Sequence, residues 1–165
     1  MRGTPVARLD YPLMGPRAQQ FAARVRRRLA FDRPPGNPAL LLAYAPLEVM
    51  TLGWSPELSA VLVLRHNRVL SGLNKTRPPA RRHFSFWHEI GHYLMHQESL
   101  QLCQGEEAWA NGPEREANDF ATNLLMPAQW VREAHRVGGN VKARAREFGV
   151  SPQAMGRRLR ELDMK

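Results

Sequence analysis

Cysteine is nearly absent from this sequence, since Cys103 is the only one among 165 residues. A lone cysteine excludes an intramolecular disulfide and suits a reducing compartment. Long hydrophobic runs are also missing: the longest, PALLLAYAPL from Pro38, has about half the length of a membrane-spanning helix. The first residues hold no apolar stretch of signal-peptide length, because Arg8, Asp10 and several prolines interrupt them. We therefore expect a cytoplasmic protein with no membrane segment.

Acidic residues are scarce outside one segment of the chain. The formal net charge is +9, yet residues 88–130 hold seven acidic side chains and a single arginine, Arg115. An acidic segment of this kind suits a divalent cation. The basic remainder favours an acidic partner or nucleic acid, unless its arginines serve only to keep the surface soluble.

Apolar spacing predicts helices around a short block of strands, and no repeats or low-complexity segments interrupt the pattern. Strands are expected over 48–54 and over 60–74, the latter as a pair that turns at His66 and Asn67. Helices are expected over 18–31, 38–45, 113–126 and 127–137, from about Pro78 to 97, and as two short helices around Gly149. Residues 98–112 are expected to form a polar loop. The predicted class is α+β, with a small, mainly antiparallel sheet.

Three histidines lie four residues apart in FSFWHEIGHYLMHQ, residues 84–97. His88 and His92 fall one turn apart on one side of a helix, so their rings can bind one ion. Glu89 follows the first histidine and can reach water beside that ion. This HExxH pattern combines two zinc ligands with a general base, and Gly91 is expected to leave space beside the rings. The alternative is a helix whose histidines are exposed or satisfied elsewhere.

A catalytic zinc ion usually has three protein ligands, and the third is expected from EREANDF, residues 114–120. Glu114 and Asn118 are four residues apart and face the same way on a second helix. Glu114 could bind the ion, while Asn118 could hydrogen-bond a ligand histidine. Glu116, about 160° round that helix, is the competing ligand. Helical geometry favours Glu114 and leaves Glu116 as a supporting carboxylate.

Hydrolysis of a peptide at such a site needs a base and a donor for the developing oxyanion. Glu89 would take a proton from water activated by the metal and return it to the leaving amine. The candidate oxyanion donors are Tyr93, His83 and His96. Tyr93 points toward the core on the helical count, and a histidine at a helix end, such as His96, is often solvated. Cys103 falls in the expected loop and is expected to be inert. The ligands also suit manganese or iron.

Two stretches in this order, RRHFSFWHEIGHYLMH and EREANDFATNLLMP, resemble the ImmA/IrrE metallopeptidases. The resemblance is strong over residues 60–130 and extends to the order and length of the flanking helices. It implies a zincin-like fold around the HExxH helix, and by position it implies the same roles: His88 and His92 as zinc ligands, Glu89 as catalytic base, Glu114 as third ligand and Asn118 as support. Trp87 departs from the family, which usually has a small residue there.

The resemblance also implies a cytoplasmic endopeptidase that cleaves a helix-turn-helix transcriptional repressor at one site, in a stress response or a mobile element. Because such a repressor is basic, as this chain is, we expect the acidic segment 88–130 to recruit it. We expect residues 1–137 to form the metallopeptidase domain. Residues 138–165 are expected to form a helical, helix-turn-helix-like segment packed on the same domain.

The C-terminal segment also supports a rival function. Gly149 and its small and apolar neighbours have the spacing of a helix-turn-helix, and Arg157, Arg158 and Arg160 follow where base or phosphate contacts would be made. The protein could then be a DNA-binding regulator with a structural or vestigial metal site. One such unit makes too few contacts for tight specific binding without dimerisation. A structural zinc site also needs four ligands, and only three are credible. We therefore favour the peptidase over direct nucleic-acid binding.

Overall fold

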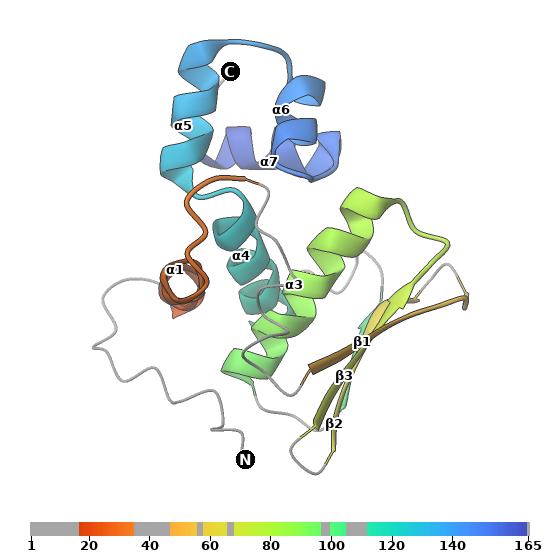
Figure 1. Ribbon diagram of the computed structural model, residues 1–165. Helices are drawn as coiled ribbons and strands as arrows, with labels where there is room; N and C mark the ends of the chain where they lie inside the picture. The colour runs from red at the N-terminus through yellow and green to blue at the C-terminus, as the bar shows by residue number, and fades with distance from the viewer. Residues whose placement is uncertain are drawn as a thin grey trace.

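The computed structural model describes residues 17–34, 47–55, 58–65, 68–96, 100–104 and 112–164. Six helices and one four-stranded sheet lie within these ranges (Figure 1). The helices are α1 (Arg17–Arg28), α3 (Pro79–Met95), α4 (Gly112–Leu125), α5 (Ala128–Val137), α6 (Val141–Glu147) and α7 (Pro152–Glu161). The strands are β1 (Leu47–Leu52), β2 (Leu58–Arg65), β3 (Arg68–Asn74) and β4 (Leu100–Gln104). The predicted α+β class is confirmed.

The sheet is built on the antiparallel pair of β2 and β3, in which Ala60 lies opposite Leu73. β4 joins the other side of β2, again antiparallel, while β1 runs parallel to β3. The strand order is therefore β1-β3-β2-β4, and the sheet is mainly antiparallel, as predicted. The expected turn at His66 and Asn67 and the expected helix over 38–45 lie outside the described residues.

β4 differs from the sequence prediction, because it occupies part of the segment expected to be a loop. Cys103 therefore lies in a strand, opposite Ala60 of β2. The segment LQLCQ begins with an apolar–polar alternation that Cys103 interrupts, and five residues in polar surroundings carry too weak a pattern to identify a strand. Pairing with β2, and not local propensity, decides the conformation of this edge strand.

Proline marks the start of two helices, and glycine marks the end of one. α3 begins directly after Pro78 and α5 directly after Pro127, because a proline at the start of a helix sacrifices no hydrogen bond. Gly138 ends α5 with a φ of 95°, a conformation that glycine adopts without the strain of a side chain. These boundaries match the prediction. α1 instead ends at Arg28, before the predicted end at residue 31, and the chain turns through Ala30.

α3 runs between the sheet and α4, and α1 packs against α4 (Figure 1). The side of α3 that carries Phe86 and Ile90 is buried, as predicted, while Tyr93 and Leu94 are half-buried against the same core. Trp87 is fully buried, so this departure from the family pattern points into the core. No helix in the described ranges is both long and apolar enough to span a membrane.

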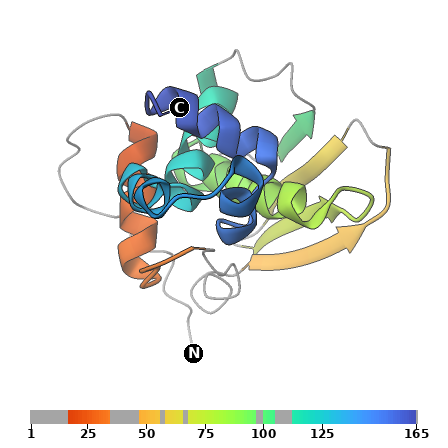
Figure 2. The same ribbon diagram turned by 90° about the horizontal axis from the view of Figure 1, so that it is seen from above.

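The C-terminal helices are tied to the rest of the chain by polar contacts. Gly149, with φ of 65°, lies between α6 and α7, and its carbonyl oxygen lies 3.2 Å from Nδ1 of His83 on α3. Arg158 of α7 donates from Nε to the carbonyl oxygen of Met126 at 3.0 Å and from Nη2 to Oδ1 of Asn123 at 2.9 Å. Figure 2, seen from above, shows these helices over α3 and α4.

Candidate metal centre

α3 brings the two histidines of the HExxH motif together. His88 and His92 lie one helical turn apart, and their Nε2 atoms are 3.0 Å from each other. Both side chains are almost completely buried, at 3% and 1% exposure. Glu89, between them in sequence, is buried as well. The helix therefore presents two imidazole nitrogens to one point, shielded from bulk water.

α4 supplies the carboxylate. Oε2 of Glu114 lies 3.1 Å from Nε2 of His88, and Oε1 lies 3.1 Å from Nε2 of His92. The three side chains form a group that could hold a metal ion. Glu116 does not approach the two histidines in this way. Of the two glutamates that the sequence offered as third ligand, the structure brings Glu114 to the site.

Close packing of α3 and α4 depends on Gly91. A Cβ atom there would lie 3.0 Å from Cδ1 of Phe120 and 3.2 Å from Cα of Ala117, both on α4. The glycine thus lets the two helices approach each other. This differs from the prediction that Gly91 leaves space beside the histidine rings, because the side of the helix that lacks a side chain faces α4.

The spacing of the donor atoms fits a divalent ion. In a tetrahedral site with zinc bonds of about 2.0–2.1 Å, ligand atoms are about 3.3 Å apart. The nitrogen and oxygen atoms of His88, His92 and Glu114 are 3.0–3.1 Å apart, so an outward movement of a few tenths of an ångström reaches that geometry. Two imidazoles and one carboxylate suit zinc, and also manganese or iron.

Protonation of the ligands also suits a metal. Burial raises the pKa of Glu114, but its close side-chain interactions with His88 and His92 outweigh this and lower that pKa to about 2. Burial lowers the pKa of His88 below its ordinary value, more than Glu114 raises it. At neutral pH the carboxylate is therefore charged and His88 is neutral, the states in which both groups bind a cation.

Each ligand histidine is oriented by a partner at its other nitrogen. Nδ1 of His88 donates to Oδ1 of Asn118 on α4 at 3.0 Å, which leaves the Nε2 lone pair directed at the centre. Nδ1 of His92 lies 3.0 Å from Nδ1 of His96, and Nε2 of His96 lies 3.0 Å from Oε2 of Glu116. Glu116 thus reaches the site only through His96.

Arg17 of α1 extends this series of side-chain contacts beyond Glu116. Its Nη1 lies 3.6 Å from Oε2 of Glu116, and its Nη2 donates to the carbonyl oxygen of Met95. Sequence analysis did not identify Arg17, because no motif links an N-terminal arginine to a histidine on a later helix. Only the packing of α1 against α4 brings them together.

His83, one of the predicted oxyanion donors, lies away from the metal centre. The indole Nε1 of Trp87 donates to Nε2 of His83 at 3.1 Å, so Nδ1 carries the ring proton and donates to the carbonyl oxygen of Gly149. Both nitrogens are engaged between α3 and the C-terminal helices, and His83 is therefore not an oxyanion donor. Tyr93 packs against the core. Of the predicted cleft residues, His96 is therefore the one that contacts a candidate metal ligand, His92.

Comparison with known proteins identifies the same region. The family model described as the IrrE N-terminal-like domain, Peptidase_M78, matches residues 46–160. The match covers more than two thirds of the chain and includes the strands β1 to β4, the metal centre and the C-terminal helices. The resemblance inferred from the two sequence motifs is thus confirmed. No curated protein matches the chain.

Proposed function

We propose that this chain, which belongs to the Peptidase_M78 family of IrrE N-terminal-like domains, is a zinc-dependent endopeptidase. The observation that carries the proposal is the convergence of Nε2 of His88, Nε2 of His92 and the carboxylate of Glu114 to 3.0–3.1 Å. Three protein ligands would leave one coordination position of a bound zinc ion open, as catalytic zinc sites require. A closed, four-ligand structural site has no support among the described residues.

Each residue of the site has a separate role in peptide hydrolysis. When bound, zinc supplies Lewis acidity, which polarises a carbonyl group and lowers the pKa of water toward about 7. Glu89 acts as the base: it accepts a proton as water attacks the peptide carbonyl and returns it to the leaving amine. Asn118 and His96 hold the ligand histidines in the tautomers that bind the ion. Burial of the motif excludes bulk water from the reacting groups.

The substrate is a protein, and we propose that it is a helix-turn-helix transcriptional repressor. The resemblance to the ImmA/IrrE peptidases implies this substrate, and with it a cytoplasmic location and a role in a stress response or a mobile element. Zinc is the proposed ion, although the same three ligands accept manganese or iron. Residues 1–137 are proposed as the peptidase domain, with residues 138–165 packed on it through Arg158 and Gly149.

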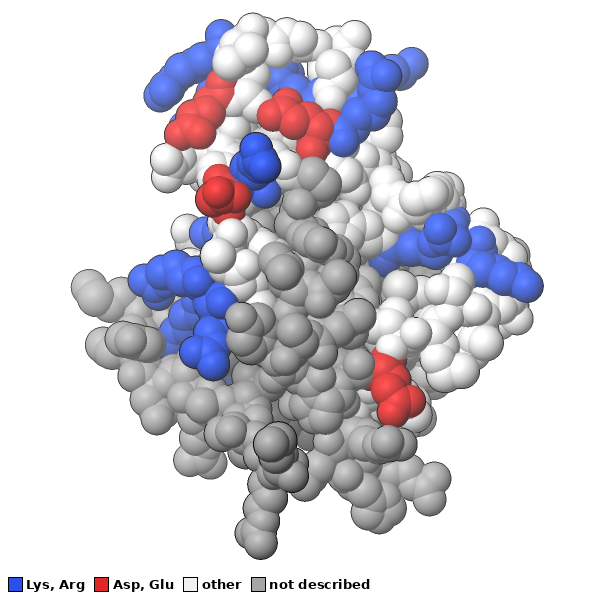
Figure 3. All heavy atoms as spheres, viewed as in Figure 1, with Lys and Arg blue, Asp and Glu red and all other residues white. Residues whose placement is uncertain are grey.

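The rival function, a DNA-binding regulator, has weaker support. Arg158, one of the arginines expected to contact DNA, is buried at 7% exposure and donates to Met126, Asn123 and Glu161. It therefore stabilises the fold instead of meeting a phosphate. On the face that it draws, Figure 3 shows acidic side chains interspersed with basic ones around the C-terminal helices, whereas DNA binding favours a continuous basic surface.

A direct test measures the metal content of the purified protein and of its Glu89→Gln variant by elemental mass spectrometry. We expect about one zinc ion per chain in both, and cleavage of a co-expressed helix-turn-helix repressor by the unchanged protein alone. Absence of metal from both proteins after reconstitution with zinc would overturn the peptidase. Loss of metal only from the variant would show that Glu89 is a ligand and not the base.

A further inference from the structure

A groove runs beside the metal centre between α3, α4 and α7. It consists of two adjoining hollows that share Phe84, Ala154 and Arg157. One hollow continues to Arg81 near the start of α3, and the other continues to Asn118 and Met126 on the α4 side. We call these six residues the α3–α7 groove.

The groove reaches the hydrogen-bond partner of a candidate metal ligand. Asn118, which lines it, accepts the hydrogen bond from His88 at 3.0 Å. Phe84 lies one helical turn before His88 and therefore on the same side of α3. Arg81 lies seven residues before His88, a distance of about 10 Å along a helix axis. An extended peptide spans about 3.3 Å per residue, so this distance corresponds to about three residues of a bound chain.

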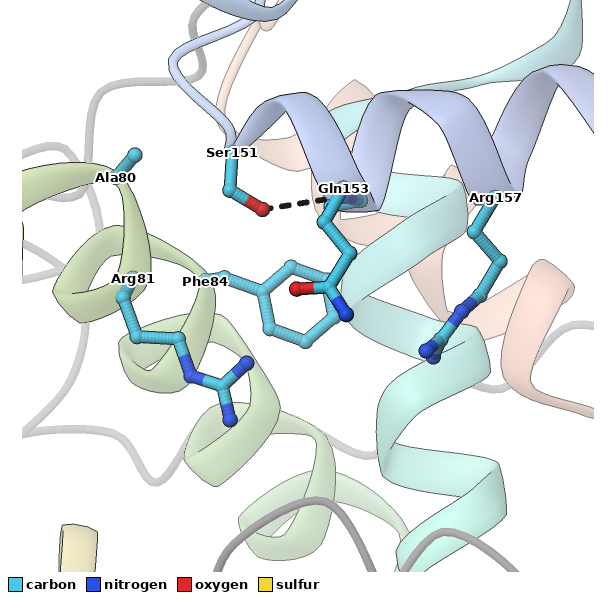
Figure 4. Close-up of a pocket in the computed structure, with 7 residues that line it drawn as sticks. Ala80, Arg81, Phe84, Ser151, Gln153 and Arg157 are labelled. Carbon is cyan, nitrogen blue, oxygen red and sulfur yellow. Dashed lines mark hydrogen bonds between the residues drawn. The ribbon is translucent and has the colours of Figure 1, made fainter.

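The groove has an apolar base and basic sides. Figure 4 shows the ring of Phe84 between the side chains of Arg81 and Arg157, with Gln153 across it. Around this hollow the lining contains the two arginines and, among the described residues, no carboxylate. The hollow that reaches Asn118 contains both signs of charge: Arg115 lies 4.0 Å from Asp119, and Arg158 lies 3.1 Å from Glu161. The hollow at the Arg81 end is thus lined by basic and uncharged side chains.

We propose that the α3–α7 groove binds the substrate polypeptide on one side of the scissile bond. Phe84 contacts an apolar side chain about two residues from that bond, and Arg81 and Arg157 contact an acidic side chain about three residues from it. α7 then serves as one wall of the substrate cleft. The proposal rests on the proposed peptidase function and adds a sequence preference to it. Continuity with Asn118 and the apolar base favour a peptide over nucleic acid.

The test compares cleavage of a proteome-derived peptide library by the zinc-loaded protein and by an Arg81→Glu/Arg157→Glu double variant, with mass spectrometric identification of the cut sites. We expect Asp and Glu to be enriched about three residues from the cut, a preference of about tenfold that the double variant reverses toward Lys and Arg. The matched control, Arg132→Glu/Arg136→Glu, makes the same charge change on exposed positions of α5 and should leave the preference unchanged.

A second measurement separates this proposal from the peptidase itself. Fluorescent peptide pools with Glu or Lys at one fixed position are titrated into the zinc-loaded Glu89→Gln protein, with and without the arginine reversals, and followed by anisotropy. Tighter binding of the Glu pool that disappears on reversal supports the groove even if no peptide is cleaved. Cleavage without an acidic preference overturns the groove and leaves the peptidase intact. Arginine reversals that weaken binding of a random DNA duplex but not of peptides would also overturn it.

Equal melting temperatures and zinc contents establish that the variants are folded. If the double reversal is unfolded, the milder Arg81→Gln/Arg157→Gln variant replaces it. With two charges removed and none reversed, we expect the preference for Asp and Glu to disappear without turning toward Lys and Arg. An acidic preference that survives in this folded variant would overturn the proposal.

Discussion

Nε2 of His96 lies 3.0 Å from Oε2 of Glu116, and this contact joins α3 to α4 one turn beyond the ligand pair. Through His96 it connects Glu116 to Nδ1 of His92, and Arg17 of α1 approaches Glu116 from the other side. Contacts from α1, α3 and α4 therefore converge on His96, the hydrogen-bond partner of the candidate ligand His92. The orientation of His92 depends on a carboxylate that never approaches the ligand nitrogens.

Alanine variants of Glu116 and Glu114 distinguish a supporting carboxylate from a metal ligand. We expect Glu116→Ala to lower zinc affinity by about tenfold, because His96 loses the acceptor that holds its tautomer. Glu114→Ala should lose most of the bound zinc, since it removes one of three ligands. Competition with a chelator measures both, and Arg115→Ala, at an exposed position on the same helix, is the control. A greater loss in the Glu116 variant would reverse the two assignments.

Asn118 is expected to act through its oxygen atom. Asn118→Leu should weaken zinc binding by about tenfold, because Nδ1 of His88 loses the acceptor that fixes the ring. Asn118→Asp keeps an oxygen at this position and should restore most of the affinity, which a purely packing role does not predict. Isothermal titration with zinc distinguishes the two variants, and equal affinities would argue against the hydrogen bond as the cause.

Gly91 is expected to be required for the approach of α4. An alanine there meets Phe120 and Ala117 at 3.0–3.2 Å, and the overpacking should cost about 1–3 kcal/mol, partly offset by better helix propensity. Gly156→Ala in α7 is the matched control, since its Cβ meets no atom closer than 3.7 Å and should gain up to about 1 kcal/mol. Urea unfolding measures both changes. Equal stabilisation by the two alanines would refute the close contact.

The stability of the metal-free protein should depend on pH through His88. Burial lowers the pKa of His88 below 6.5, so in acid the unfolded chain takes up a proton that the folded state resists. Its contribution is thus complete above pH 6.5 and is lost as pH falls through the lowered folded value. Free energies of unfolding measured between pH 7.5 and 5.5 should decline, and His88→Gln should flatten the decline. An unchanged slope in the variant would assign the effect to other groups.

Part of the metal centre could be predicted from the sequence alone. A helical period of 3.6 residues places His88 beside His92 wherever the helix lies, and it also places Glu114 and Asn118 on one side of α4. These relationships are local, so spacing was sufficient to predict them. Asn118 and Glu114 then meet the two histidines because one helix face packs on another.

Contacts between distant segments could not be predicted in this way. His83 resembled a cleft residue by its position near the motif, yet a hydrogen bond to Gly149 draws it to the C-terminal helices. Arg158 resembled a DNA contact by its position in a second helix, yet it satisfies the carbonyl of Met126. In both cases the partner lies more than 30 residues away in sequence, beyond any periodic pattern.

By itself the sequence determined the α+β class, the helix starts at proline, the family and the two motifs whose side chains converge. These properties follow from local backbone preferences and from fixed residue spacing. The tertiary structure alone decided that LQLCQ is a strand, that Gly91 serves helix packing, and that Arg17 reaches Glu116. Each of these depends on which surfaces pack together, because the free energy of a buried contact belongs to both partners and neither segment encodes it alone.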